Sequence, residues 1–119
     1  MKTNTPTALL RIFISSTDHI KQNLLSESIV FSAKKEGLGG ATVLKGILGY
    51  GASSVIHSYK FWEVADKVPI VIELIDEEDK IRNFYETIRP QLESMRYGCL
   101  VTIENVEVLL LKSGKNKKE

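Results

Sequence analysis

The sequence predicts an α+β fold in which a four-stranded antiparallel sheet carries two helices on one face. Three observations lead to this prediction. Four stretches alternate apolar and other side chains with the period of two that is typical of strands. Two longer stretches repeat apolar residues at the spacing of amphipathic helices. The order along the chain is strand, helix, strand, strand, helix, strand.

Length and composition are those of one globular domain. With 119 residues the chain can form a single core, and we assign residues 8–111 to it. We expect residues 1–7 to be a flexible lead-in and residues 112–119 a disordered tail. Hydrophobic residues make up 43% and charged residues 26%, which is ordinary for a globular protein. The formal net charge of +1 gives no electrostatic footprint for nucleic acid.

The single cysteine, Cys99, excludes a disulfide framework. A small buried side chain is the simpler interpretation of this thiol, and a reactive thiol is the alternative. No apolar run approaches the roughly 18 residues of a membrane span. Residues 1–7 also lack the apolar stretch of a secretory signal. We therefore expect a cytoplasmic protein without direct membrane insertion.

The first strand is the run ALLRIFIS at residues 8–15. Side chains of a strand alternate between the two faces of its sheet. One face is therefore entirely apolar, and the other is apolar apart from one arginine. The two sets are Leu10, Ile12 and Ile14 on the first face, and Leu9, Arg11 and Phe13 on the second.

The first helix follows this strand. Residues 15–18 offer several N-cap candidates, and the helix should be established by Gln22 and run to about Glu36. Gly37 can adopt the positive φ of a helix stop, with the next leucine folding back on the helix. An apolar stripe can cover the first strand, and it consists of Leu25, Ile29 and Ala33.

The central part of the chain is a hairpin with an enlarged connection. Its strands are the runs at residues 41–48 and 68–75. Hairpin loops usually need only about 2 to 5 residues. Here a segment rich in glycine and serine occupies about residues 47–58, and residues 59–64 form a returning arm. Enlarged loops usually carry function, so we expect this loop to do so.

The second helix begins after the third strand. Asp76 is a good N-cap candidate, and the acidic residues 77–79 suit the positive end of the helix dipole. Pro90 predicts a kink or a break near Arg89, with a short second piece up to Tyr97. The apolar stripe before and after the proline consists of Ile81, Phe84, Tyr85, Ile88, Leu92 and Met95.

The last strand should run over residues 100–111, bent or bulged at residues 104–105. The economical packing of these elements is the ferredoxin-like βαββαβ sandwich, with both helices on one face of the sheet. Apolar residues on an otherwise open sheet face usually mark an interface, so we expect an oligomer. The residues concerned are Leu9, Phe13, Leu44, Val71 and Ile75.

Several stretches resemble the PII-like proteins of the uncharacterised-domain family 190. They are LLRIFIS, GLGGATVLKGILGYG, the loop GYGASSVIHS, VPIVIELID and GCLVTIENVEV, in the expected order. That family is similar to the nitrogen regulatory PII proteins. The resemblance covers about residues 9–110. It implies a homotrimer of ferredoxin-like subunits whose sheets line the centre, with adenine nucleotides bound in clefts between subunits.

The resemblance further implies a signalling protein and not an enzyme. ATP, ADP or AMP would be an effector, with no cofactor required. In PII proteins a long loop after the second strand docks onto transporters, enzymes or regulators. This implies a membrane transporter or an enzyme as the regulated partner here. The docking residues would be Tyr50, Ser53, Ser54 and His57.

Site residues can be carried over from the resemblance. Thr42 and Glu73 lie where PII proteins contact the adenine edge, and Ile75 lies near the ring. Threonine can donate and accept a hydrogen bond, and glutamate can accept one from an exocyclic amine. Glycine N–H groups can line a phosphate. The predicted ligand-binding set is Thr42, Lys45, Gly46, Gly49, Gly51, Glu73, Ile75 and Gly98.

The chain departs from the PII pattern in two places. PII proteins have a phosphate cradle with glycine and lysine before the last strand, whereas this chain passes from Tyr97 and Gly98 straight to Cys99. The last strand reads TIENVEV and lacks the paired basic residues of PII proteins. Weak nucleotide binding, a different ligand and loss of binding are therefore three open outcomes.

Individual residues have simpler interpretations as well. Glu73 lies in an apolar strand, so its carboxylate must be paired or face a polar cleft. An ion pair with Arg11 is one alternative, and an acceptor in an intersubunit cleft is the one that we favour. His57 is expected to be an exposed loop residue, because no cysteine or second histidine nearby completes a metal site. Lys45 is either a solvated charge or a phosphate partner.

Two other functions need features that the sequence lacks. A small enzyme on the same fold, such as an acyl-phosphate hydrolase or a dimeric-barrel oxidoreductase, needs a nucleophile with a base or a cofactor pocket. The sequence has no Ser/His/Asp order, no metal spacing and no Cys/His pair. RNA recognition on the sheet needs several aromatics, and Phe13 alone does not supply them.

Overall fold

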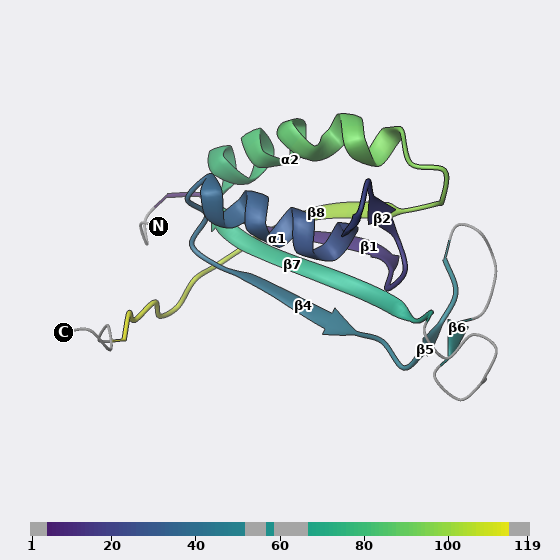
Figure 1. Cartoon of the computed structure of the whole chain (residues 1–119). Helices are drawn as coiled ribbons and strands as arrows, with labels where there is room; N and C mark the ends of the chain where they lie inside the picture. Colours follow the sequence, from purple (N-terminus) through teal and green to yellow (C-terminus); the bar gives the residue numbers. More distant parts are fainter. Residues whose placement is uncertain (1–4, 52–56, 59–66, 115–119) are drawn as a thin grey trace.

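The computed structural model describes residues 5–51, 57–58 and 67–114. Four strands form one antiparallel sheet in the spatial order β4-β7-β1-β8. Both helices lie on the same face of this sheet (Figure 1). The predicted α+β, ferredoxin-like fold is therefore confirmed. The strands are β1 at Thr7–Ser15, β4 at Ala41–Lys45, β7 at Pro69–Glu77 and β8 at Leu100–Val106.

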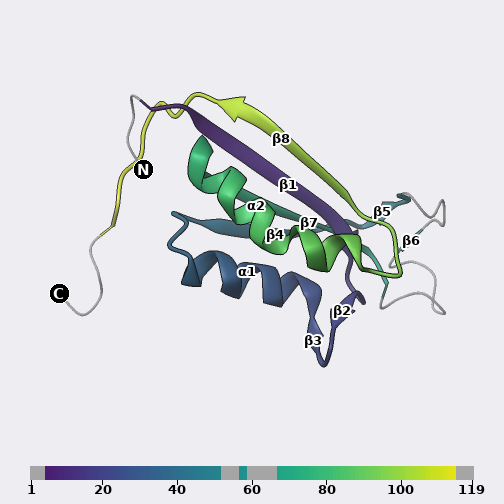
Figure 2. The same cartoon turned by 90° about the horizontal axis from the view of Figure 1, so that it is seen from above.

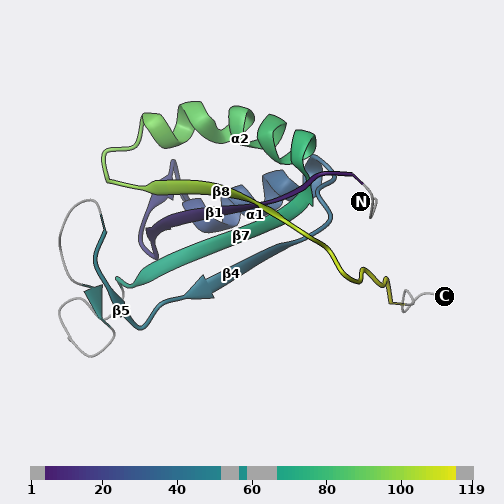
Figure 3. The same cartoon turned by 180° about the vertical axis from the view of Figure 1, so that it is seen from behind.

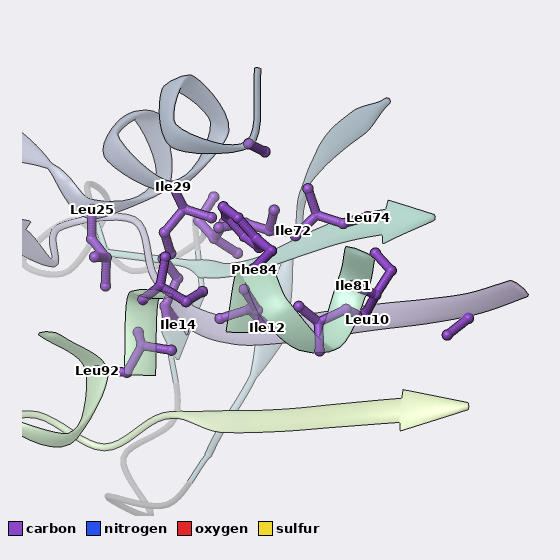
Figure 4. Close-up of a cluster of buried hydrophobic side chains, with 14 residues drawn as sticks. Leu10, Ile12, Ile14, Leu25, Ile29, Ile72, Leu74, Ile81, Phe84 and Leu92 are labelled. Atoms are coloured by element: carbon purple, nitrogen blue, oxygen red, sulfur yellow. The ribbon is translucent and has the colours of Figure 1, made fainter. Parts of the chain in front are cut away.

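The core lies between the sheet and the helices α1 (Leu25–Lys35) and α2 (Glu78–Glu93). In β1 and β7, alternate residues face the helices and are at most 7% exposed. Phe84 of α2 is 1% exposed and packs between α1 and the sheet (Figure 4). The predicted apolar faces of the first strand and of both helices are thus the ones that meet. The sheet contributes Leu10, Ile12, Ile14, Ile70, Ile72 and Leu74.

The helix α1 begins later than the sequence predicted. A small hairpin precedes it, formed by β2 (His19–Ile20) and β3 (Asn23–Leu24), with Lys21 at a φ of 57° in its turn. Residues 15–18 therefore do not supply the N-cap residue, which is Leu24, although the carbonyl oxygen of Asp18 accepts the N–H of Leu25 at 2.8 Å. The chain instead enters α1 directly from β3.

The predicted stop at the end of α1 is confirmed. Gly37 has a φ of 84°, which is favourable only for a residue without a Cβ. The N–H of Leu38 donates to the carbonyl oxygen of Ala33 at 3.0 Å. This closes the last turn in the way expected of a glycine stop. Leu38 also packs against the core.

Of the kink or break predicted at Pro90, the break is wrong, because α2 continues through Pro90 to Glu93. A proline in a helix frees the carbonyl group four residues earlier, here that of Glu86. Both residues lie on the exposed side of α2, where water can satisfy the freed carbonyl. Ile88 and Leu92 on the opposite side are buried and hold the helix on the sheet.

The sequence predicted Asp76 as the N-cap of α2, but Glu77 occupies that position. Asp76 is the penultimate residue of β7 and is 1% exposed. Its Oδ2 accepts the N–H of Gly39 at 2.7 Å, and its Oδ1 accepts the N–H of Glu77 at 2.6 Å. The Nζ of Lys80 lies 3.8 Å from Oδ2. The carboxylate therefore fastens the connection between α1 and β4 to the end of β7.

The last strand ends earlier than predicted and is not bulged at residues 104–105. β8 pairs with β1 without interruption, from Leu100 opposite Phe13 to Val106 opposite Thr7. It ends opposite Thr7, the first residue of β1, which follows Pro6. Residues 107–111, predicted as strand, lie beyond the sheet.

The second strand is also shorter than predicted. β4 ends at Lys45, and the N–H of Gly46 then donates to the carbonyl oxygen of Pro69 at 2.7 Å. Within the predicted loop, β5 (Leu48–Gly49) pairs with β6 (His57–Ser58). The predicted returning arm, residues 59–64, lies outside the described residues.

Candidate functional site

The face of the sheet that points away from the helices, here called the open face, is the first candidate site. In Figure 3 the strands lie in front of α1, with no helix of the described chain covering this face. Its apolar residues are only half-buried, or exposed as in Leu44 (47%) and Leu100 (55%). The predicted apolar patch is thus present on this face. The half-buried members are Leu9, Phe13, Val71 and Ile75.

A charged network crosses the middle of the open face. Arg11 lies directly opposite Glu73, and its Nε donates to Glu73 Oε2 at 2.9 Å. Its Nη1 also donates to Glu104 of β8. These hydrogen bonds, first the one to Glu73 and then the one to Glu104, raise the pKa of Arg11. One guanidinium thus faces two carboxylates, and the ion pair considered for Glu73 is present.

Three predicted ligand residues lie together beside this network. Thr42 of β4 is directly opposite Glu73 of β7, and Ile75 follows on the same face. Among the described residues, Glu73 Oε1 and the Thr42 hydroxyl have no hydrogen-bond partner. Lys45 lies on the other face of β4, because it stands at an odd distance from Thr42 along the strand. The structure therefore does not bring Lys45 to the Thr42 group.

Two predicted glycines have a packing reason. A Cβ on Gly46 or on Gly49 would lie 3.1 Å from a side-chain carbon of Pro69. Such contacts are tighter than most Cβ contacts in proteins. Both positions therefore let the chain pass close to the start of β7. The structure therefore explains both glycines by backbone packing, which the sequence did not predict.

The second candidate site is a cavity of about 400 Å³ at the end of the sheet where β1 ends and β8 begins. The β2–β3 hairpin, β5 and the connection from α2 to β8 gather at this end (Figures 1 and 2). The cavity is lined by three predicted residues, Tyr50, Gly51 and Gly98. The predicted residues are therefore scattered: Thr42, Glu73 and Ile75 lie on the open face, these three line the cavity, and Lys45, Gly46 and Gly49 belong to neither group.

Sequence reasoning missed the acidic residue in the cavity wall, Asp18. It is 4% exposed, and its Oδ2 accepts the N–H of Ser15 at 2.9 Å. The sequence offered it only as one of several helix caps. A short polar turn after a buried strand was the available signal, but the turn does not reveal which side chain becomes buried.

Cys99 also lines the cavity and is partly buried. Burial, and secondarily the charge of Asp18, raise the pKa of its thiol above the ordinary 9.0. An activated cysteine nucleophile has a lowered pKa. Of the two interpretations drawn from the sequence, the partly buried thiol agrees better with this environment.

Two cations flank the aromatic ring of Tyr97 at the cavity. The Nζ of Lys67 lies 5.6 Å from the ring centre, and the guanidinium carbon of Arg96 lies 5.9 Å from it. Both distances are within the range of cation–π attraction. Lys67 and Tyr97 line the cavity, so its wall carries one cation as well as the carboxylate of Asp18.

The predicted docking loop is only partly described. Tyr50 is 73% exposed, and Gly49 is paired with His57. Ser53 and Ser54 lie outside the described residues. Across residues 5–51, 57–58 and 67–114, no three His, Cys, Asp or Glu side chains gather in a way that suits a metal ion. Neither described helix is long and apolar enough to cross a membrane.

The chain is similar to proteins of known sequence and structure. A UPF0166 protein of Aquifex aeolicus is 38% identical over 103 residues, which are 87% of this chain and 93% of that protein. CPII, a nitrogen regulatory PII-like protein from Thiomonas intermedia K12 solved with ADP, AMP and bicarbonate, matches with a TM-score of 0.61. The identity is 17%, and the match covers 87% of this chain and 94% of CPII.

A second solved structure has the same fold. It is a candidate PII-like signaling protein from Thermus thermophilus, with a TM-score of 0.60 and 22% identity. The match covers 87% of this chain and 90% of that one. These two likenesses identify the fold as PII-like. The model of the DUF190 family, described as "Uncharacterized ACR, COG1993", matches residues 7–108, and the chain therefore belongs to this family.

Proposed function

We propose that the chain is a PII-like regulatory protein of the cytoplasm and not an enzyme. It assembles as a trimer through the open face and binds an adenine nucleotide, such as ATP, ADP or AMP, between protomers. The observation that carries the proposal is the composition of the open face. This face carries a group of apolar residues that no described helix covers, yet Thr42 and Glu73 lie side by side on it with unused hydrogen-bonding atoms.

The apolar residues favour association through this face. Contiguous apolar surface on a soluble protein commonly marks an interaction site. The charged network does not oppose burial strongly, because Arg11 hydrogen-bonds to both Glu73 and Glu104. Buried charges are tolerated when they are paired and hydrogen-bonded in this way. A second and a third copy of the chain are therefore suitable partners for this face.

The free atoms beside the network suit a purine edge. The unused Oε1 of Glu73 can accept from an exocyclic amine, and the hydroxyl of Thr42 can donate to a ring nitrogen. Ile75, on the same face, offers an apolar surface to the ring. The structure of CPII contains ADP and AMP, which supports the same ligand class for this fold. Binding between protomers would couple the ligand to assembly.

The loop around β5 and β6 is the proposed docking site for the regulated partner. Tyr50 exposes 73% of its surface next to the pair formed by Gly49 and His57. Exposed aromatic residues are effective anchors for protein partners. A membrane transporter or an enzyme is the proposed partner. Regulation requires that the nucleotide bind the two states of the loop with different affinities.

Calorimetric titration with ATP, ADP and AMP tests the nucleotide part of the proposal. We expect measurable heat with at least one nucleotide, and a dissociation constant raised at least about tenfold in Glu73→Gln and Thr42→Val, as for the loss of a polar contact. Glu107→Gln, an exposed change outside the sheet, is the matched control. Heatless titrations with all three nucleotides and an unchanged melting temperature would reject this part.

A further inference from the structure

Four consecutive apolar residues follow shortly after the end of β8, and three of them are exposed. These residues, 108–111, read Val-Leu-Leu-Leu and are here called the leucine segment. Leu109, Leu110 and Leu111 are 88%, 79% and 50% exposed. Single exposed leucines are ordinary on a protein surface, but contiguous apolar residues usually mark an interaction site. The leucine segment therefore needs a partner that no described residue supplies.

The leucine segment is accessible to such a partner. In Figures 1 and 3 the chain after β8 runs away from the sheet and from both helices. The loop around β5 and β6, which is the proposed docking site, lies at the opposite end of the sheet. A contact made by the leucine segment therefore leaves this loop free.

A basic tail, residues 112–119, follows the leucine segment directly. It contains four lysines and one glutamate, whereas the whole chain has a net charge of only +1. The rest of the chain is therefore net negative, and the positive charge is concentrated beside the leucines. The four lysines are Lys112, Lys115, Lys117 and Lys118.

Apolar side chains next to a cluster of lysines match the chemistry of an anionic membrane surface. Anionic headgroups attract the lysines, and the leucines can insert at the boundary between headgroups and acyl chains. Membrane attachment is strengthened when an apolar signal and a basic signal act together. Such a contact is peripheral, because four apolar residues are far too few to span a bilayer.

Two other partners match only part of this chemistry. A nucleic acid would attract the lysines, but its phosphates offer nothing to three exposed leucines. A second copy of the chain could cover the leucines. However, the open face is the apolar surface already described on such a copy, and the proposed trimer uses it. The membrane is the partner that uses both the leucines and the lysines.

We propose that the leucine segment and the basic tail attach the protein peripherally to an anionic lipid bilayer. This contact goes beyond the proposed function and does not depend on it, because it uses no residue of the nucleotide group or of the docking loop. Absence of nucleotide binding would therefore leave it intact. A trimer would carry three tails and bind more strongly than a monomer, since linked contacts raise one another's effective concentration.

Flotation of the full chain with lipid vesicles tests the proposal. Vesicles of phosphatidylcholine with about 30% phosphatidylserine supply the anionic surface, and vesicles of phosphatidylcholine alone are the reference. At low salt we expect the partition coefficient to be at least about tenfold larger on the anionic vesicles. The difference should shrink as added salt screens the lysines. Equal partition to both kinds of vesicle, or partition to neither, would overturn the proposal.

A double variant tests the apolar part. Leu109→Ser with Leu110→Ser changes the two most exposed leucines, so the fold should be unaffected, and we expect partition to the anionic vesicles to fall at least about tenfold. Phe31→Ser, which removes an exposed apolar side chain from α1, is the matched control and should bind as the wild type does. Unchanged partition of the leucine variant would overturn the proposal.

A second double variant tests the basic part. We expect Lys112→Gln with Lys115→Gln to lower the same partition coefficient at least about tenfold. Lys34→Gln with Lys35→Gln, at exposed lysines of α1, is the matched control and should have little effect. Light scattering of the leucine variant should show the mass of the wild type. A lowered mass with unchanged vesicle binding would assign the leucine segment to a contact between copies and overturn the proposal.

Discussion

Alternate residues of the same strands form the two faces of the sheet, but the described helices cover only one of these faces. On the helix side, Leu10, Ile12 and Leu74 are at most 2% exposed and belong to one cluster with apolar residues of α1 and α2. On the open face, half-buried apolar residues surround the network centred on Arg11. One face therefore supplies the stability of the protomer, and the other has the composition of a surface for association.

The largest effect is expected from the centre of the helix side. Phe84→Ala removes a side chain that is 1% exposed, and we expect it to lower the free energy of unfolding by about 3–5 kcal/mol. Phe31→Ala is the matched control, because Phe31 of α1 is 68% exposed and should cost less than about 0.5 kcal/mol. Urea unfolding measures both. Equal losses would mean that the core is not where the structure places it.

A charge on the open face should separate association from folding. We expect Phe13→Lys to raise the dissociation constant of the proposed trimer at least about 100-fold, because it would bury an unpaired charge in each interface. Light scattering after size exclusion measures the mass. Phe31→Lys, the same change on the solvent side of α1, should leave the trimer intact. A monomeric wild type, or a trimeric Phe13→Lys protein, would contradict the role given to this face.

A somewhat smaller effect is expected at the end of β7. Asp76→Ala leaves the N–H groups of Gly39 and Glu77 without their acceptor, and we expect it to lower the free energy of unfolding by about 2 kcal/mol. Asp79→Ala removes the same charge from an exposed position and should cost less than about 0.5 kcal/mol. A loss as small as that of the control would show that the two N–H groups find other acceptors.

The smallest effect concerns Glu78, which joins the helix side to the edge strand β8. Hydrogen bonds from Arg82, and then from Asn105, lower the pKa of Glu78 below its ordinary 4.5. The stabilisation by the ionised form is therefore complete above the unfolded pKa and is lost as pH falls through the folded one. We expect the stability advantage of wild type over Glu78→Gln to shrink below about pH 4.5.

Urea unfolding of the two proteins at neutral and acidic pH measures this difference. Glu107→Gln, at a residue with no ion pair among those described, is expected to show no such change with pH. An advantage that grows as pH falls would reverse the assigned sign. It would mean that the protonated form of Glu78, and not the carboxylate, stabilises the fold.

Much of the fold follows from local patterns. The alternation in residues 8–15 correctly assigned the buried and open faces of β1, because side chains in a strand alternate whatever lies beside it. Gly37 marked the end of α1 because its positive φ is a local requirement. The errors occurred where the outcome depends on neighbours. Pro90 does not break α2, because tertiary contacts of Ile88 and Leu92 hold the helix on the sheet.

The candidate sites were predictable in part, for the same reason. The sequence drew attention to Glu73, but only the register could show that Arg11 and Thr42 lie on either side of it. Asp18 could not be distinguished from the other polar residues of its turn. Its burial depends on the connection between α2 and β8, more than seventy residues further along the chain. No local pattern carries that information.

The sequence by itself determined the order of the main elements, the core face of each and the presence of an apolar face left uncovered, because short-range periodicity specifies all three. Only the tertiary structure decided which charges meet and which cavity forms. Ion pairs and cavity walls are made by residues far apart in the chain, and their positions follow from strand register and from the packing of whole elements.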